Sequence, residues 1–183
     1  GAEARTPPWT MHADFSTEQW TVRTEGGSAN RVFHGTALVQ PGRLVLESPA
    51  LQASASEPLR IGFRHRHAFE FDSEYWDGGV LEISTDDGAS WTDLAPALYN
   101  GTITNEPASN PYQGRPAFVG NNPAYPDYDT VSVDLGTAYA GRNVLIRFVV
   151  ATDAAVGTAG WEVDDITISG IDNAPFTCVV GHG

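Results

Sequence analysis

The sequence predicts an all-β protein, a sandwich of two antiparallel sheets, and three observations carry the prediction. The chain has 19 glycines and 12 prolines among 183 residues, and they recur at roughly the eight- to twelve-residue spacing of turns in a sandwich. The segments between them are short and alternate apolar with polar residues. No segment sustains a 3.6-residue apolar period, so a helical domain is not expected.

Seven segments carry the strand pattern: 31–38, 43–51, 59–71, 79–85, 130–135, 143–152 and 161–168. In the third, alternate residues share one face, which we assign to the core: Leu59, Ile61, Phe63, His65, His67, Phe69 and Phe71. Arg60, Arg64, Arg66 and Glu70 lie at intervening positions, so the opposite face is expected to lie in water.

The last predicted strand changes phase. Trp161 and Val163 are apolar at odd positions, whereas Ile166 and Ile168 are apolar at even ones. A strand with a two-residue period can change phase only by inserting one residue. We therefore predict a β-bulge at Asp164–Asp165.

Charge and length limit the kinds of partner. All ten cations are arginines, and they face 23 carboxylates, for a net charge of −13. Nucleic acids and anionic membranes need a basic surface, so the charge balance argues against both as partners. No apolar run approaches the roughly 20 residues of a membrane span. The length indicates a single domain over 1–183, with a flexible segment at 1–8, which lacks signal-peptide features, and a tail at 172–183. Cys178 is the only cysteine and cannot form an internal disulfide; whether it is free stays open.

The segment 84–91 matches the Asp-box pattern S-x-D-x-G-x-[ST]-W of a β-hairpin, with Ser84, Asp86, Gly88 and Trp91 at its fixed positions. We expect Asp86 to accept backbone N–H bonds, Gly88 to take a positive φ, and Trp91 to pack over the turn. The motif is structural, and a single copy excludes a propeller.

Two sets of side chains are candidate metal ligands. Asp14, Glu47, Asp164 and Asp165 would converge if the first and last strands were neighbours, and they are predicted to bind one structural Ca²⁺. His65 and His67 share a strand face, as in some transition-metal sites. Because they fall in register with apolar residues, core histidines are the alternative.

The segment 94–130 is the least regular and holds four of the six tyrosines. A long ordered loop of this kind is usually functional. Trp76, Tyr112, Tyr125 and Tyr128 are the predicted ligand contacts, since aromatic rings give contact area at low entropic cost; packing of the loop onto the sandwich is the alternative. No motif of a hydrolase or phosphate-binding enzyme occurs, so the chain is not expected to be an enzyme.

Several runs, spread over about residues 30–170, carry a resemblance to a known family. They include Trp76-Asp77-Gly78-Gly79 leading into the hairpin, and Gly160-Trp161 with Asp164-Asp165 near the end. The chain resembles the MAM-like jelly-roll domains attached to bacterial extracellular metalloproteases and surface proteins and, more distantly, reelin-type repeats. The resemblance implies a secreted, non-catalytic accessory sandwich, often stabilised by Ca²⁺. His67 departs from it, since such modules tend to carry an aromatic residue there.

We therefore expect an extracellular jelly-roll module that binds polysaccharide or protein through the loops at 96–130. The alternative is a self-assembling subunit of an extracellular filament or surface layer.

Overall fold

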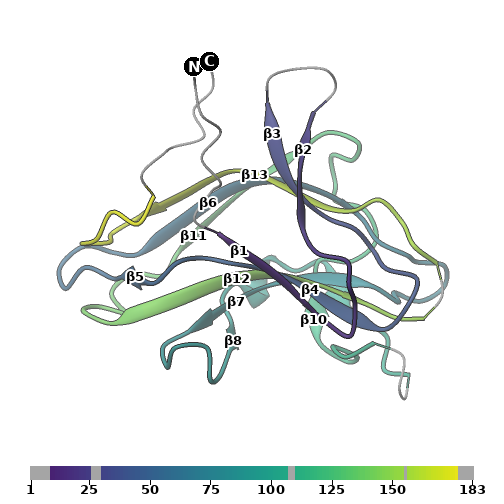
Figure 1. Cartoon of the computed structure of the whole chain (residues 1–183), viewed down its shortest axis with the longest axis horizontal. Coiled ribbons are helices and arrows are strands. Elements are labelled where there is room, and N and C mark those ends of the chain that lie inside the picture. The colour runs from purple at the N-terminus through teal and green to yellow at the C-terminus, as the bar shows by residue number, and fades with distance from the viewer. Residues whose placement is uncertain (1–8, 26–29, 107–109, 155, 177–183) are drawn as a thin grey trace.

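A computed structural model describes residues 9–25, 30–106, 110–154 and 156–176, which form a sandwich of two antiparallel sheets (Figure 1). The first sheet has the order β1 (Thr10–Asp14), β4 (Gly42–Glu47), β12 (Asn143–Thr152), β7 (Gly78–Ser84) and β8 (Thr92–Asp93), with β5 (Leu51–Gln52) also paired to β12. The second has the order β11 (Asp129–Asp134), β6 (Arg60–Ala68), β13 (Gly160–Ser169), β3 (Arg31–Gly35) and β2 (Thr21–Thr24). A two-stranded ribbon, β9 (Gly101–Thr102) and β10 (Pro116–Ala117), and one 3₁₀ turn, η1 (Pro96–Leu98), complete the described elements.

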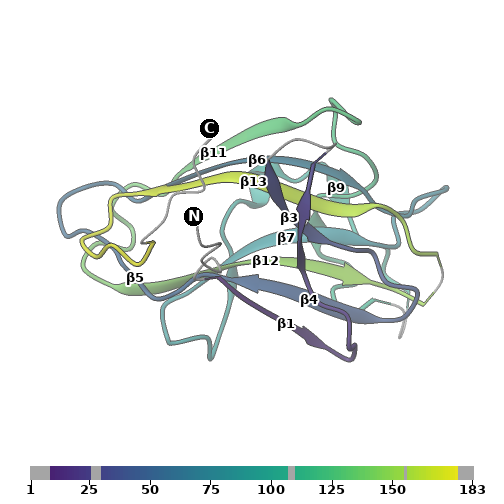
Figure 2. The same ribbon diagram turned by 45° about the horizontal axis from the view of Figure 1, so that its top comes forward.

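The order of the strands is that of a jelly roll. From β3 onward, the described chain passes from one main sheet to the other at almost every step. Within these two sheets, β7 and β8 are the only strands after β3 that are both successive and paired. The sheets are β4-β12-β7-β8 and β3-β13-β6-β11, extended by β1 and β2 at their edges. This double-sheet connectivity confirms the predicted fold class. Figure 2 shows β11, β6 and β13 in the layer above β12 and β4.

Aromatic side chains fill the space between the sheets. The Trp161 indole is wholly buried, and its centroid lies 5.6 Å from the rings of Phe148 and Phe118 and 6.1 Å from that of Trp20. The alternation predicted for 59–71 is confirmed as far as Phe69. The alternate residues assigned to the core, from Leu59 to Phe69, are all buried. Phe71 is the exception and is 52% exposed, because β6 ends at Ala68 and residue 71 lies in the following turn.

The β-bulge is confirmed in the middle of β13. Asp164 pairs with Arg64, whereas the next paired residue, Thr167, faces Gly62, so two residues oppose one. Asp165 has φ of 49°, the backbone conformation that lets the bulge fit.

The two ends of the described chain meet at one end of the sandwich. Trp9 stacks on Phe176 at 6.0 Å, and the segment 172–176 is tied to the chain around β5 by hydrogen bonds of Asp172 and Asn173 to Gln52. The connections β1–β2, β3–β4, β6–β7 and β12–β13 lie at the opposite end. The predicted segment 1–8 and Cys178 lie outside the described residues. Within those residues, no helix is long and apolar enough to cross a membrane.

Candidate functional site

A pocket of about 260 Å³ opens at one end of the second sheet, on the face that points away from the core. The pairing of β6, β13 and β3 places Arg66, Glu162 and His34 side by side across it. Arg23 of β2 borders one side, and Tyr125 and Pro126 of the 120–128 loop border another.

A hydrogen-bond network fixes the polar groups of the pocket. Arg66 Nε donates to Glu162 Oε2 at 2.6 Å, and the Tyr128 hydroxyl donates to the same oxygen at 2.8 Å. Burial opposes ionisation of Glu162, but these two hydrogen bonds outweigh it and lower the pKa of the carboxyl. The Tyr128 ring lies between two guanidinium groups, 4.7 Å from Arg66 and 4.8 Å from Arg64. Glu162 is therefore a fixed anion beside a fixed cation.

The rim of the pocket carries side chains that are not held by a network of this kind. The exposed Arg23 side chain has no hydrogen-bond or ion-pair partner among the described residues, and the Tyr125 ring is 40% exposed. Deeper in the pocket, His34 Nε2 lies 2.7 Å from the Ala159 carbonyl oxygen. Burial lowers the pKa of His34, so this imidazole is a neutral donor. The pocket thus combines one free cation, one fixed ion pair and one available aromatic face.

Of the four predicted ligand contacts, Tyr125 lines this pocket, and Tyr128 does not line it but bonds to Glu162, which does. Trp76 lies elsewhere, half-buried, with its indole N–H 3.3 Å from Asp72 Oδ1. Tyr112 is only 5% exposed and packs against the first sheet. A ring buried to that degree is not available to stack on a ligand.

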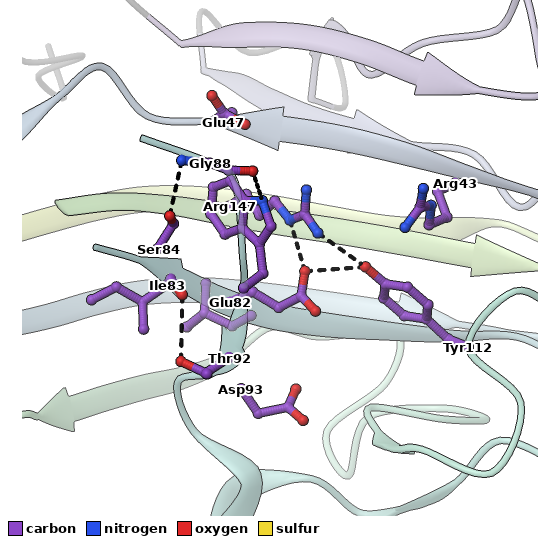
Figure 3. A network of polar contacts seen from close by, with 12 residues as sticks. Arg43, Glu47, Glu82, Ile83, Ser84, Gly88, Thr92, Asp93, Tyr112 and Arg147 are labelled. Atoms are coloured by element: carbon purple, nitrogen blue, oxygen red, sulfur yellow. Dashed lines mark hydrogen bonds and ion pairs between the residues drawn. The ribbon is translucent and has the colours of Figure 1, made fainter. Parts of the chain in front are cut away.

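Tyr112 belongs instead to a buried polar network around Glu82 (Figure 3). Arg147 Nε lies 2.7 Å from Glu82 Oε2, the Tyr112 hydroxyl lies 3.1 Å from the same oxygen, and Arg115 reaches Oε1 at 2.8 Å. A second apolar cluster surrounds the network and joins the outer face of the first sheet to residues 103–119: Val45, Val80, Ile103, Tyr112, Ala117, Val119, Val149 and Ala151. The first part of the long tyrosine-rich segment therefore covers a sheet, and only its last part borders the pocket.

The turn between β7 and β8 is held by its own side chains. Asp86 Oδ1 accepts the N–H of Ser90 at 2.9 Å, and Ser84 Oγ accepts that of Gly88 at 2.9 Å. These and other hydrogen bonds, foremost from the Ser90 and Ser84 hydroxyls, lower the pKa of Asp86 to about 2. Gly88 has φ of 85°. Trp91 lies over the turn, donates to the Gly88 carbonyl at 3.0 Å, and stacks against the Arg147 guanidinium, 3.9 Å away.

The four carboxylates predicted to share a calcium ion do not meet. Asp14 and Glu47 lie at opposite ends of the β1–β4 pair, since Glu47 pairs with Thr10 and Asp14 with Arg43. Asp164 and Asp165 are in the other sheet. Each carboxylate has a different neighbour, Arg43 for Asp14, His12 for Glu47, Asn30 for Asp164 and Arg64 for Asp165. Sequence alternation predicts a face but not which sheet a strand joins, and calcium binding itself stays a prediction.

His65 and His67 are core residues. His65 Nδ1 accepts the Trp161 indole N–H at 3.1 Å, and His67 Nδ1 donates to the Gly120 carbonyl at 3.0 Å. Burial lowers the pKa of both to about 4, and for His65 the charge of His67 adds to the effect. In the part of the chain that the structure describes, no group of three or more His, Cys, Asp or Glu side chains is placed to hold a metal.

The pocket residues Arg23, Arg66 and Glu162 were not predicted as a site. Arg66 was assigned to a solvated face, and that assignment gave the direction of the side chain correctly. The available signal was that Arg66 and Glu162 point outward from strands with clear alternation. The sequence does not predict which strands pair, and it is the pairing of β6, β13 and β3 that brings these residues together.

Comparison with known proteins supports the fold. No family model matches the chain. It is 21% identical over 168 residues to bacillopeptidase F of Bacillus subtilis (strain 168), covering 88% of this chain but only 10% of that protein. The K1 cleaved adhesin domain of Lys-gingipain from Porphyromonas gingivalis W83 superposes with a TM-score of 0.53 and 15% identity, covering 89% of this chain and 90% of that one. A carbohydrate-binding module of the β-sandwich superfamily gives a TM-score of 0.48 and 12% identity, over 88% of this chain and 57% of that one.

The stacking of Trp91 on the turn should stabilise the first sheet. We expect Trp91→Ala to lower the free energy of unfolding by about 3 kcal/mol, the low end for tryptophan truncation because the ring is only half-buried. Trp91→Phe keeps the ring over Arg147 but removes the indole N–H, and should cost about 1 kcal/mol. Urea denaturation measures both. A loss below about 1 kcal/mol for the alanine variant would contradict this role.

The two core histidines predict loss of stability in mild acid. The unfolded chain binds their protons near pH 6.5 and the folded chain only near pH 4, so stability falls as the pH falls through that window. Protonation of the first of these two histidines should lower the free energy of unfolding by about 3 kcal/mol.

Burial raises the pKa of Asp77 to about 8. The folded chain therefore binds this proton more tightly than the unfolded chain, and protonation of Asp77 increases stability as the pH falls. Because this effect opposes that of the histidines, variants are more informative than the wild type alone. His67→Gln keeps a donor for Gly120 and cannot take up a proton. Its free energy of unfolding should depend less on pH between 6.5 and 4. The same change at the exposed His12 is the control, and equal slopes for His67→Gln and wild type would disprove the assignment.

Proposed function

We propose that this chain is a non-catalytic binding module of an extracellular protein, and that it binds a carbohydrate in the pocket formed by Arg66, Glu162 and Tyr125. The observation that carries the proposal is the combination of a fixed ion pair with a free cation and an exposed ring in one concave site.

The chemistry of the pocket suits a sugar. A ring of hydroxyl groups presents donors and acceptors in pairs. Beside the Glu162 carboxylate, Arg66 keeps N–H donors beyond those that bond to Glu162 and to the Pro126 carbonyl. The exposed Tyr125 ring supplies a face for the apolar side of a pyranose. At about 260 Å³, the pocket is smaller than the range of about 300–1,000 Å³ of sites for drug-sized ligands. It therefore suits one sugar unit, at the end or branch of a polysaccharide.

Two further observations support the non-catalytic and extracellular parts of the proposal. The histidines at the pocket, His34 and His67, are held by backbone carbonyls, which leaves them structural rather than poised for proton transfer. The likeness to an adhesin domain and to a tenth of bacillopeptidase F supports a module within a larger protein that acts outside the cell.

Binding should be lost when the free groups of the pocket are removed. A glycan array with the wild-type chain identifies the sugar, and isothermal titration with that sugar then compares variants. We expect Arg23→Ala and Tyr125→Ala to weaken binding by about tenfold each, or about 1.4 kcal/mol, because neither side chain supports the fold. Tyr75→Ala, a change of an equally exposed ring outside the pocket, is the matched control. Unchanged affinity in both pocket variants would refute the site.

A second candidate function is self-association through the loop end of the sandwich, the end at which the connections β1–β2, β3–β4, β6–β7 and β12–β13 lie. Six of the seven exposed large apolar side chains in the described part of the chain belong to loops at that end: Phe15, Val39, Phe71, Tyr75, Tyr125 and Val156. Soluble monomers seldom gather exposed apolar residues in this way unless the patch has a partner.

Contacts along the loops link most of these residues into one patch. Gln40, beside Val39, donates to the Phe15 carbonyl at 3.0 Å, and the Val156 N–H donates to Glu70 Oε2, next to Phe71, at 3.0 Å. Phe71 and Tyr75 lie 6.1 Å apart. Two copies meeting at the same patch form a closed dimer, so a filament would need a second surface.

Salt should reveal this association. The net charge of −13 repels a second copy at low ionic strength, and about 0.5 M salt screens that repulsion. Analytical ultracentrifugation should show a monomer in about 20 mM salt and a growing dimer fraction in about 0.5 M salt. Phe71→Ser should suppress the dimer, whereas Leu98→Ser, at the exposed apolar residue of η1, should not. A monomer under all conditions would eliminate this candidate.

A further inference from the structure

Two aspartates meet where β7 begins and β12 ends, away from the pocket. Asp77 directly precedes β7 and Asp153 directly follows β12. The pairing of Gly78 with Ala151 brings these two strand ends together, and the Asp153 N–H donates to Asp77 Oδ1 at 2.9 Å. The two residues are thus held in place by the sheet itself.

Asp77 is wholly buried, with 0% of its surface exposed. Its second carboxylate oxygen, Oδ2, is also buried and has no hydrogen-bond partner among the described residues. Buried polar atoms are nearly always paired, because the loss of water costs free energy that only a new partner restores. This carboxylate oxygen therefore lacks a partner that either a bound cation or a proton on the carboxyl would supply.

Among the described residues, the surroundings of Asp77 provide negative charge and no arginine or histidine to balance it. The carboxylates of Asp153 and Glu70 both act on Asp77, and no arginine or histidine is among the groups that do. Glu70 is held by the Val156 N–H, while Asp153 is buried beside Asp77. This contrasts with Glu82, the other deeply buried carboxylate of this sheet, which has two arginine partners.

We propose that Asp77 and Asp153 bind a divalent cation, and that the cation is calcium. Oxygen is the only ligand atom that the two side chains offer, and oxygen-only sites select hard cations. Two carboxylates do not complete a site, and no third His, Cys, Asp or Glu in the described ranges joins them. Calcium accepts backbone carbonyls and water at its remaining positions and tolerates irregular geometry, which magnesium does less readily.

The cation would tie the start of β7 to the segment that follows β12. It would also neutralise the buried charge that otherwise opposes folding. Its main effect would therefore be on stability and on the order of the loop end.

The test measures calcium binding and stability in the full chain. Protein stripped with EGTA and dialysed is titrated with CaCl₂ by calorimetry, and its melting temperature is recorded with and without calcium at pH 7.5. We expect one ion per chain and a rise in melting temperature of about 5 °C or more at saturation. MgCl₂ at the same concentration should give a smaller shift.

The variant Asp77→Asn distinguishes neutralisation of Asp77 by a cation from neutralisation by a proton, because asparagine has the same shape and no charge. The variant should fold, bind no calcium and show no calcium-dependent shift. Asp153→Asn provides a second variant should the first not fold, and it should weaken binding by at least tenfold. Asp14→Asn, in a residue of the originally predicted calcium set, is the matched control and should respond as the wild type does.

Three results would overturn the proposal. One is a wild-type melting temperature that does not respond to calcium. Another is a calcium response that persists in Asp77→Asn, which would place the ion elsewhere. The third is an Asp77→Asn variant more stable than wild type at pH 7.5 while neither protein binds calcium, which would show that a proton neutralises Asp77. None of these results bears on sugar binding in the pocket.

Discussion

The position of the Trp161 indole between the sheets is the constraint on which the rest of the structure depends. The ring approaches β7 so closely that a Cβ atom on Gly79 would lie 2.6 Å from it, so only glycine permits this packing distance. The indole N–H bonds to His65 in the neighbouring strand. Because that bond needs an unprotonated Nδ1, the packing of one tryptophan also fixes the charge state of a buried histidine.

The same strand then sets the functional face. Alternation along β13 turns Trp161 into the core and Glu162 outward, where Arg66 and Tyr128 hold it. Two residues later the bulge changes the phase. Without the bulge, Ile166 and Ile168, which pack against the core cluster, would point to the opposite face. The apolar positions of β13 thus fix the polar positions of the pocket.

The exclusive use of arginine follows from how this acidic chain uses its cations. Arg66 and Arg147 each combine a hydrogen-bonded carboxylate with a stacked aromatic ring, and Arg115 contacts two carboxylates and a tyrosine ring. A planar guanidinium serves several partners at once and stays charged when partly buried, which an ammonium does poorly. The arginines are therefore the counter-charges of carboxylates on the sheet faces, whereas Asp77 has no arginine partner among the described residues.

Sequence reasoning predicted those features that depend on period and failed on those that depend on pairing. Alternation located each of the long strands, the core face of β6 and the bulge in β13. It missed β1 and β2, since these short edge strands have one partner each and little burial to impose a pattern. Of the predicted calcium ligands, Asp14 and Glu47 end their strands, whereas Asp164 and Asp165 lie in the bulge of β13. Which of these positions meet is decided by the tertiary pairing. Asp77 and Asp153 are 76 residues apart, and only the register of β7 on β12 places them together.

The tyrosine-rich segment 94–130 also shows that a sequence pattern does not predict tertiary placement. Its first half carries Tyr112 into a second apolar cluster. Its second half crosses between the sheets: one bridge joins Phe118 to Gly79 of the first sheet, and the next joins Asn121 to Ala68 of the second. A tyrosine on a covering loop and a tyrosine at a pocket rim have the same composition around them, so sequence alone cannot tell them apart. The crossing also explains why the pocket, the apolar patch and the Asp77–Asp153 pair share one end of the sandwich. At that end the loops of both sheets meet, whereas the contact between Trp9 and Phe176 lies at the far end.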